Sequence, residues 1–130
     1  MSMETTRRRQ LVLRIVLNEI SDDYENLKIT KQVHRTSSDC RMTVSHHEIL
    51  QALTDLITAK LAKAYRLSNG VEPIDGMPSA TEIGSPDAPA VEDAFFWITK
   101  KGMKLQLAAY SDWPFDDDNQ LRADWKPPEG

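Results

Sequence analysis

Three histidines flank the only cysteine of this chain, and these four side chains are the first candidates for nucleophilic or metal chemistry. A cysteine nucleophile needs a base within hydrogen-bond reach, and Cys40 has His34, His46 and His47 near it in the sequence. Nothing else marks Cys40 as activated, so a small buried apolar role is favoured. His46 and His47 are adjacent, so on a helix their side chains diverge by about 100° and cannot hold one ion as an i, i+4 pair does. We therefore predict neither a catalytic residue nor a metal site.

Asp116, Asp117 and Asp118 form an acidic run that offers paired carboxylates for acid–base chemistry. Such work requires a pKa shifted by burial or by a neighbouring like charge, and no predicted strand or pocket surrounds this run. We expect the three carboxylates to be ionised and solvated. The sequence also has no phosphate-binding glycine loop and no dinucleotide fingerprint. These observations predict a protein that is not an enzyme and uses no cofactor.

Cationic and amide side chains suited to DNA lie on both sides of Ser45. Direct readout of the major groove uses Arg, Lys, Asn or Gln from the first turns of a recognition helix, whereas phosphate contacts need only cations. Gln51 is the clearest candidate reader, and Asp55 on the same outward face would repel phosphates. The candidate DNA-binding residues are Lys28, Lys31, Arg35, Arg41, His46, His47, Gln51, Lys63 and Arg66. Ordinary solvated surface accounts for such a set almost as well, so both interpretations stay open.

Three aromatic side chains occupy an acidic C-terminal stretch, residues 111–130, that has no helical period. Trp113, Phe115 and Trp125 are candidate partner-binding residues, because exposed aromatic side chains beside acids anchor many protein interfaces. A second interpretation is that they fold back as a lid over the domain's own core, and it is favoured for Trp113 and Phe115. A protein-binding module is therefore the alternative to a DNA-binding protein.

The charge of the chain is uneven. The net charge is -4, but residues 1–70 hold 11 Lys or Arg against 8 Asp or Glu, while residues 71–130 hold 5 against 12. This total does not exclude double-stranded DNA as a partner, because the half with the DNA candidates is mildly basic, although no strong basic field argues for it. The apolar content of 40% is enough for one packed domain without metal or disulfide support.

The first apolar run of the chain, residues 11–17, follows three arginines as in a signal peptide. However, Arg14 interrupts the run and no small-residue cleavage site follows it. No apolar stretch approaches the roughly 20 residues that a membrane span requires. The lone Cys40 cannot form an internal disulfide, which favours a reducing compartment. We predict a cytoplasmic protein with no membrane partner.

Hydrophobic periodicity predicts the elements that position these residues. A broad apolar stripe predicts a helix over residues 6–20, which suits the central core helix or, in part, the face of a homodimer. Ser45 followed by Glu48 is a capping box, and the leucine-rich period behind it predicts a helix that ends near Lys60. The other predicted elements are a helix over 24–34, a break at 36–39, a very short strand at 41–44, strands at 61–67 and 95–98, and a helix from Thr99 to about Tyr110.

This order of elements, with ILQALTDLITAKLAKAY at its centre, resembles the winged helix-turn-helix superfamily, and bacterial regulators in particular. The resemblance implies an α+β winged helix with a three-helix core, a two-stranded wing and an additional C-terminal helix and tail. The winged-helix domain is then residues 1–110, with an extended wing loop at 68–94, and residues 111–130 are an aromatic, acidic extension. Many relatives place a glycine where this chain has Lys60, so a positive φ is expected there.

The resemblance also implies a function, namely a DNA-binding, transcription-regulator-like role without enzymatic activity. Regulators of this kind read paired half-sites as dimers, so a homodimer is expected. The alternative is a winged-helix protein–protein interaction module that does not bind DNA, because the same fold serves both purposes.

Overall fold

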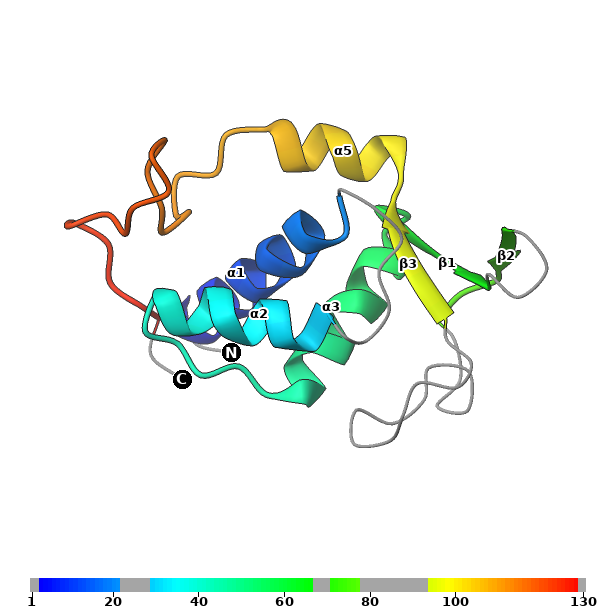
Figure 1. The fold of residues 1–130 in the computed structure, drawn as a ribbon, viewed down its shortest axis with the longest axis horizontal. Helices are drawn as coiled ribbons and strands as arrows, with labels where there is room; N and C mark the ends of the chain where they lie inside the picture. The colour runs from blue at the N-terminus through cyan, green and yellow to red at the C-terminus, as the bar shows by residue number, and fades with distance from the viewer. Residues whose placement is uncertain (1–2, 22–28, 67–70, 78–93, 129–130) are drawn as a thin grey trace.

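The computed structural model describes residues 3–21, 29–66, 71–77 and 94–128. Within these ranges the elements are α1 (Met3–Glu19), α2 (Ile29–Asp39), α3 (His46–Thr58), β1 (Ala62–Arg66), β2 (Glu72–Ile74), β3 (Ala94–Ile98) and α5 (Lys100–Leu107). Figure 1 shows α1, α2 and α3 packed together, the sheet at one end, and α5 leading into a tail that crosses the other end. Three helices followed by an antiparallel hairpin form a winged helix-turn-helix, so the predicted α+β fold is confirmed.

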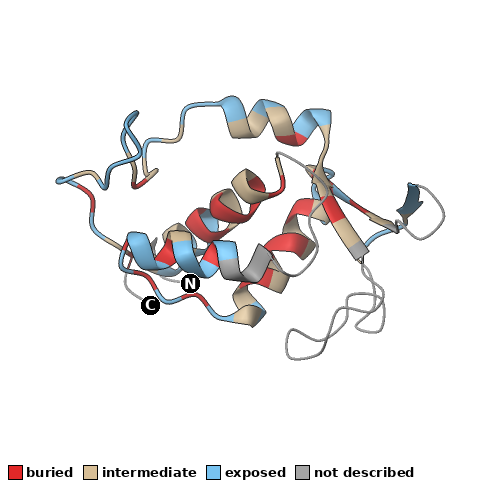
Figure 2. Cartoon of the chain, in the orientation of Figure 1, coloured by how far each residue is buried: buried red, intermediate tan, exposed pale blue. Residues whose placement is uncertain are grey.

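Helix α1 is the central core helix. Its apolar stripe is buried by the chain's own elements, since α1 contacts α2, α3 and α5 (Figure 2). Each fully buried aliphatic side chain of this kind contributes roughly 1.5–3 kcal/mol of transfer free energy. The described residues of the stripe are therefore used mainly by the domain's own core, with Leu13 only partly buried. The buried residues of the stripe are Leu11, Val12, Ile15, Val16, Leu17 and Ile20.

Helix α3 begins at the predicted capping box. The Ser45 hydroxyl accepts a hydrogen bond from the Glu48 N–H at 3.1 Å, and the Glu48 carboxylate accepts one from the Ser45 N–H at 3.1 Å. Behind the cap, Ile49, Leu53 and Leu56 are fully buried against α1 and β1. The capping box and the core face of this helix are thus confirmed.

The end of α3 is a Schellman turn with Lys60 in the left-handed conformation, at φ 62°. The Leu61 N–H donates to the Leu56 carbonyl at 2.8 Å, and the Lys60 N–H donates to the Ile57 carbonyl at 3.0 Å. The positive φ expected at Lys60 is therefore confirmed. Lys60 therefore carries backbone strain at a position where a glycine would be unstrained.

Helix α2 continues through residues 36–39, so the break predicted there is wrong. Ser37 is fully buried, and its hydroxyl donates to the Val33 carbonyl at 2.6 Å, which lets a hydroxyl residue remain inside a helix. The helix ends where Arg41 adopts φ 62° and the Met42 N–H donates to the Ser37 carbonyl at 2.7 Å. The strand predicted at 41–44 is also wrong, because in the described part of the chain this segment pairs with no strand. The predicted start of the helix lies outside the described residues.

The wing contains one strand more than predicted. β1 pairs antiparallel with β3, with Ala64 opposite Phe96, so the predicted pairing is confirmed. β2 pairs with the other edge of β1, with Tyr65 opposite Pro73, which gives the order β2-β1-β3. A proline argues against a strand in sequence, but at a sheet edge its missing N–H need not cost a ladder hydrogen bond.

Helix α5 starts at the predicted cap, where the Thr99 hydroxyl accepts from the Gly102 N–H at 3.0 Å. It ends at Leu107, earlier than the predicted Tyr110, because Ala108 is extended with φ -72° and ψ 143°. The Gln106 amide donates to the Asn18 side chain at 3.2 Å and so ties α5 to α1.

Candidate nucleic-acid interface

The outward face of α3 is polar, and the acid on it, Asp55, is paired with Arg9. His47, Gln51, Thr54 and Thr58 are spaced by four, three and four residues and therefore share one side of the helix. His47 and Thr58 are exposed, whereas Gln51 and Thr54 are partly buried. His46 lies about 100° from His47 on the helix, and its Nδ1 is buried without a hydrogen-bond partner among the described residues. Of the two histidines, only His47 is on the surface that a ligand of α3 would meet.

Both acidic residues of α3 are paired with arginines of α1. Arg8 binds the Glu48 carboxylate through Nε at 2.8 Å and Nη2 at 3.1 Å. Arg9 binds Asp55 through Nε at 3.0 Å and Nη2 at 2.9 Å. The hydrogen bond from Arg8 lowers the pKa of Glu48, so this carboxylate is ionised beside its cation. The repulsion that Asp55 was expected to exert on phosphates is offset by Arg9.

Gln51 is held in place by the same arrangement. Its side-chain N–H donates to Asp55 at 3.0 Å, and Asp55 is fixed in turn by Arg9. One N–H and the carbonyl oxygen of the Gln51 amide remain for a ligand, which is the pair that recognises adenine in the major groove. The roles of Arg8 and Arg9 were not predicted, because ion pairs 40 and 46 positions apart in sequence leave no local signal.

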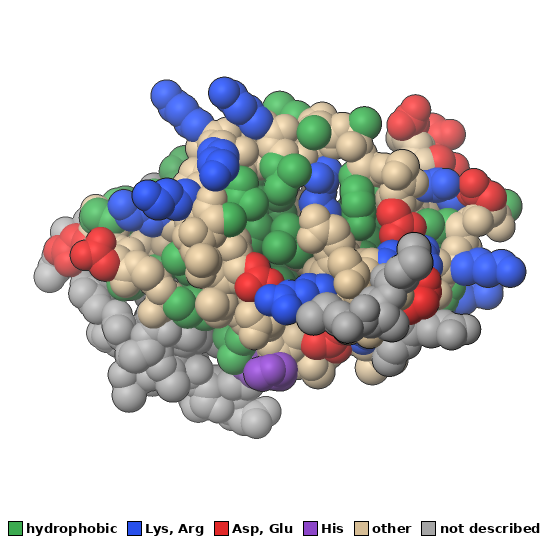
Figure 3. All heavy atoms as spheres, turned by 180° about the vertical axis from the view of Figure 1, so that it is seen from behind, with side chains coloured by type: hydrophobic (Ala, Val, Ile, Leu, Met, Phe, Trp, Pro, Cys, Tyr) green, Lys and Arg blue, Asp and Glu red, His purple; other side chains and the backbone are tan. Residues whose placement is uncertain are grey.

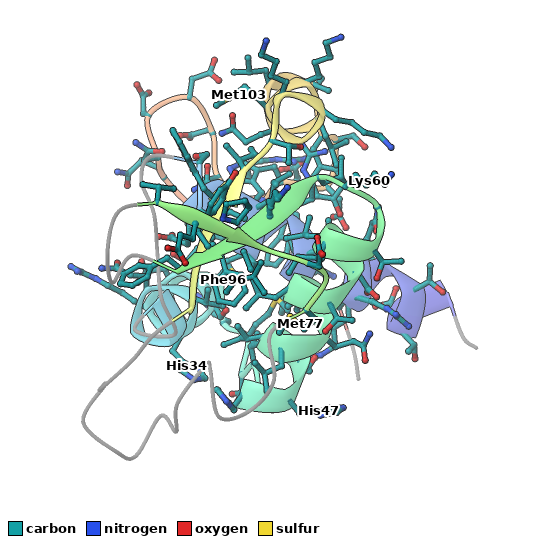
Figure 4. All side chains as sticks on the ribbon, turned by 90° about the vertical axis from the view of Figure 1, so that its right-hand side faces the viewer. His34, His47, Lys60, Met77, Phe96 and Met103 are labelled. Atoms are coloured by element: carbon teal, nitrogen blue, oxygen red, sulfur yellow. The ribbon has the colours of Figure 1, made fainter. Side chains whose placement is uncertain are left out.

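The candidate phosphate contacts lie on three different elements. Arg35 is exposed on α2, Arg41 is exposed in the turn that follows α2, and Lys63 is exposed on β1 opposite Trp97. Lys28 lies outside the described residues, and the side chains of Lys31 and Arg66 are not described, although their backbones belong to α2 and β1. Figure 4 shows the His34 side chain, from α2, and the His47 side chain, from α3, both in the lower part of that view.

A second group of cations lies at the opposite end of α3 and was missed by the sequence analysis. We call it the α5 lysine cluster, and Figure 3 shows basic side chains gathered at this end of α5. Lys101 Nζ donates to the Ala59 carbonyl at 3.1 Å, which joins the start of α5 to the end of α3. The run TKKGMK was a usable signal, but it was assigned only to a helix start. The exposed members are Lys60, Lys100, Lys101 and Lys104.

The aromatic residues of the tail pack on their own domain. Trp125 is only 8% exposed, its indole N–H donates to the Asp112 carbonyl oxygen at 2.9 Å, and the Arg7 guanidinium lies 5.5 Å from its ring centroid. Arg7 also binds the Asp112 carboxylate at 2.7 and 2.9 Å. Trp113 and Phe115 are partly buried against the core with their rings edge to face. The lid interpretation is therefore confirmed.

The chemistry of Cys40 fits the expected structural role. It is fully buried, and burial raises the pKa of its thiol to about 11, so the thiolate that a nucleophile needs is disfavoured. No group of three or more His, Cys, Asp or Glu side chains able to hold a metal ion occurs among the described residues. Within the same ranges, no helix is both long and apolar enough to cross a membrane.

Comparisons with known proteins give one structural likeness. No family model matches the chain, and no curated protein matches it. A solved structure of a PadR-like transcription factor from Bacteroides fragilis is similar, with a TM-score of 0.49 and 12% identity over 78% of this chain and 79% of that chain. At this identity the likeness concerns the course of the backbone alone.

Proposed function

We propose that this winged-helix protein binds double-stranded DNA as a transcription regulator, with the outward face of α3 in the major groove. The observation that carries the proposal is the pairing of both α3 acids with α1 arginines. A helix with two free carboxylates beside its ligand face would be repelled by phosphates, whereas the pairs with Arg8 and Arg9 leave that face neutral and hydrogen-bonding.

In this proposal Gln51 reads a base and exposed cations contact the backbone. The link from Arg9 through Asp55 to Gln51 orients the amide before DNA arrives, which lowers the entropy cost of binding. Arg35, Arg41 and Lys63 supply phosphate contacts, together with Lys28, Lys31 and Arg66 from the basic part of the chain. Such contacts set affinity and register but carry no base information.

The alternative function is a protein–protein interaction module that does not bind DNA, and the test of the proposal must exclude it. Its candidate anchors were Trp113, Phe115 and Trp125, and these are engaged with Arg7, Asp112 and the core of their own domain.

A homodimer remains part of the proposal through the resemblance to regulators that read paired half-sites, although the α1 stripe no longer supports it. Light scattering at micromolar concentration measures it directly. A monomer mass would remove the dimer and leave single-site binding.

The test is a titration of fluorescent random-sequence duplex DNA at two salt concentrations. Each true phosphate contact contributes about 0.9 to the slope of log K against log salt, so Arg35→Gln and Arg41→Gln should each weaken binding and lower the slope by about one. The matched control is Lys126→Gln, which removes one exposed positive charge from the tail. Binding weaker than about 10⁻⁴ M at physiological salt, unchanged in both arginine variants, would refute DNA binding and leave the interaction module.

A further inference from the structure

A cavity of about 420 Å³ lies between α1, α5 and the C-terminal tail, away from the proposed DNA face. Its walls include Arg14 and Asn18 from α1, Gln106 from α5, and Tyr110, Trp113, Phe115, Asp117 and Arg122 from the segment that follows α5. Sites for small molecules commonly measure about 300–1,000 Å³ and combine apolar walls with a few placed polar groups. The cavity has the size of such a site, and its lining is mainly polar, with the aromatic rings as its apolar part.

Arg14 is the distinctive group in this cavity. Its guanidinium lies 4.7 Å from the centroid of the Tyr110 ring, and Nη2 donates to the Ala108 carbonyl at 3.1 Å. Burial lowers the pKa of Arg14, and no acidic side chain pairs with it in the described part of the chain. By contrast, Arg7, Arg8 and Arg9 each bind a carboxylate. Arginine has five N–H donors, so most of those on Arg14 are left for an acceptor that the described residues do not provide.

The other walls offer surfaces for a planar group. The rings of Trp113 and Phe115 meet edge to face, with centroids 6.1 Å apart and an interplanar angle of 66°. Arg122 fixes this wall by donating to the carbonyls of Ser111 at 2.9 Å and Trp113 at 2.8 Å, while it also pairs with Asp124. Arg122 is therefore engaged in shaping the wall, and Arg14 is the cation that can receive an anion. The Asp117 carboxylate also lines the cavity and would repel an anion, so the anion must lie at the Arg14 end.

We propose that this cavity binds a small organic anion, with a carboxylate or phosphate oxyanion on the Arg14 guanidinium and a planar ring against Trp113 and Phe115. Guanidinium recognises both oxyanions through paired N–H donors, so they share one binding chemistry. The ring adds apolar contact with aromatic walls. This proposal is independent of the proposed DNA binding, because binding of the small anion is measured on the protein without DNA.

The experiment titrates the full chain with four probes followed by NMR signals of the Trp113 indole and the Arg14 side chain. Benzoate and phenyl phosphate carry a ring, whereas acetate and inorganic phosphate do not. Saturable binding of a ring-bearing probe is expected, and the stronger of the two identifies the oxyanion. Arg14→Gln should weaken it by about tenfold or more, the cost of one charge-assisted contact. Lys104→Gln is the charge-matched control, since Lys104 is an exposed α5 cation outside the cavity lining.

A second variant covers the case in which Arg14→Gln does not fold. Ser111→Phe narrows the cavity while the Ser111 carbonyl still accepts from Arg122, and it should abolish binding with the fold intact by circular dichroism. The proposal is overturned if neither ring-bearing probe saturates below about 10 mM, the weak limit for a specific small-ligand site. It is equally overturned if a folded Arg14→Gln or Ser111→Phe binds as the wild type does. Equal binding of acetate or inorganic phosphate would overturn the role of the aromatic wall.

Discussion

Replacing Gly102 by Ala tests how α5 is docked against the end of α3, on which the position of the tail depends. A Cβ at residue 102 would lie 2.0 Å from the Leu61 carbonyl oxygen and 2.7 Å from Ile98 Cγ1. Contacts of a Cβ below 3.0 Å essentially do not occur, so α5 must retreat by about 1 Å. The Leu61 carbonyl cannot yield easily, because it accepts from the Thr99 N–H at 3.0 Å and belongs to the Schellman turn.

The expected cost follows from three contributions. Forcing a methyl group into a packed contact costs about 1–3 kcal/mol. Weakening the Thr99 hydrogen bond adds about 1 kcal/mol, and the better helix propensity of alanine returns up to about 1 kcal/mol. The net destabilisation is roughly 2 kcal/mol, which for a domain of this size lowers Tm by about 8 °C.

Thermal and urea unfolding followed by circular dichroism measures this cost. The matched control is Gly76→Ala, where no atom lies within 4 Å of the added Cβ but φ is +69°, so only backbone strain of about 1–2 kcal/mol is expected. Gly102→Ala should also disturb the α5 amides in NMR spectra, whereas Gly76→Ala should not. A Gly102→Ala protein as stable as the wild type would refute the close approach of α5 to Leu61.

Three further predictions concern the turn, the tail and the recognition helix. Lys60→Gly removes a left-handed lysine and should raise the unfolding free energy by about 0.5–1 kcal/mol, whereas an unchanged or lower value would contradict the strain assigned to that turn. Trp125→Ala should speed amide hydrogen exchange of residues 111–128. Trp125→Phe should have an intermediate effect, because it keeps an aromatic ring but loses the N–H donor. Equal exchange in the wild type and both variants would contradict the role of Trp125 in holding the tail. Arg8 lowers the folded pKa of Glu48 below its ordinary 4.5, so this stabilisation is complete above that pH and is lost as the pH falls through the folded pKa. The difference in unfolding free energy between wild type and Arg8→Gln should therefore shrink in acid, and a pH-independent difference would contradict the pair.

Local signals in the sequence were sufficient for the elements that are defined by neighbouring residues. The box of Ser45 and Glu48 and the cap at Thr99 each depend on contacts a few positions apart, and both were predicted. The positive φ at Lys60 was expected from the resemblance to winged helices, whose relatives often have a glycine there. The predicted end of α2 was wrong because Ser37 is buried and its hydroxyl donates a hydrogen bond to the Val33 carbonyl. The polar character of serine gave no sign of this burial. Burial is a tertiary property, and it overrides the tendency of serine to end a helix.

The site depended on contacts that are distant in sequence, and there the prediction was weakest. Arg8 and Arg9 were seen only as an N-terminal run, yet they neutralise Glu48 and Asp55 on α3. Likewise Arg14 was noted only as an interruption of an apolar run, although it faces a cavity closed by the tail. Only the fold shows which acids Arg8 and Arg9 meet, and that Arg14 meets none among the described residues.

The most direct test of the proposed function is to map the DNA interface by NMR on the ¹⁵N-labelled full chain. On addition of a random-sequence duplex at low salt, the amide signals of His47, Gln51, Thr54 and Arg41 should shift. The amide signals of the α5 lysine cluster should not change. Shifts confined to the α5 lysine cluster would show that DNA meets the other end of the molecule. That result, or no shift at any residue, would contradict the assignment of α3 as the recognition helix.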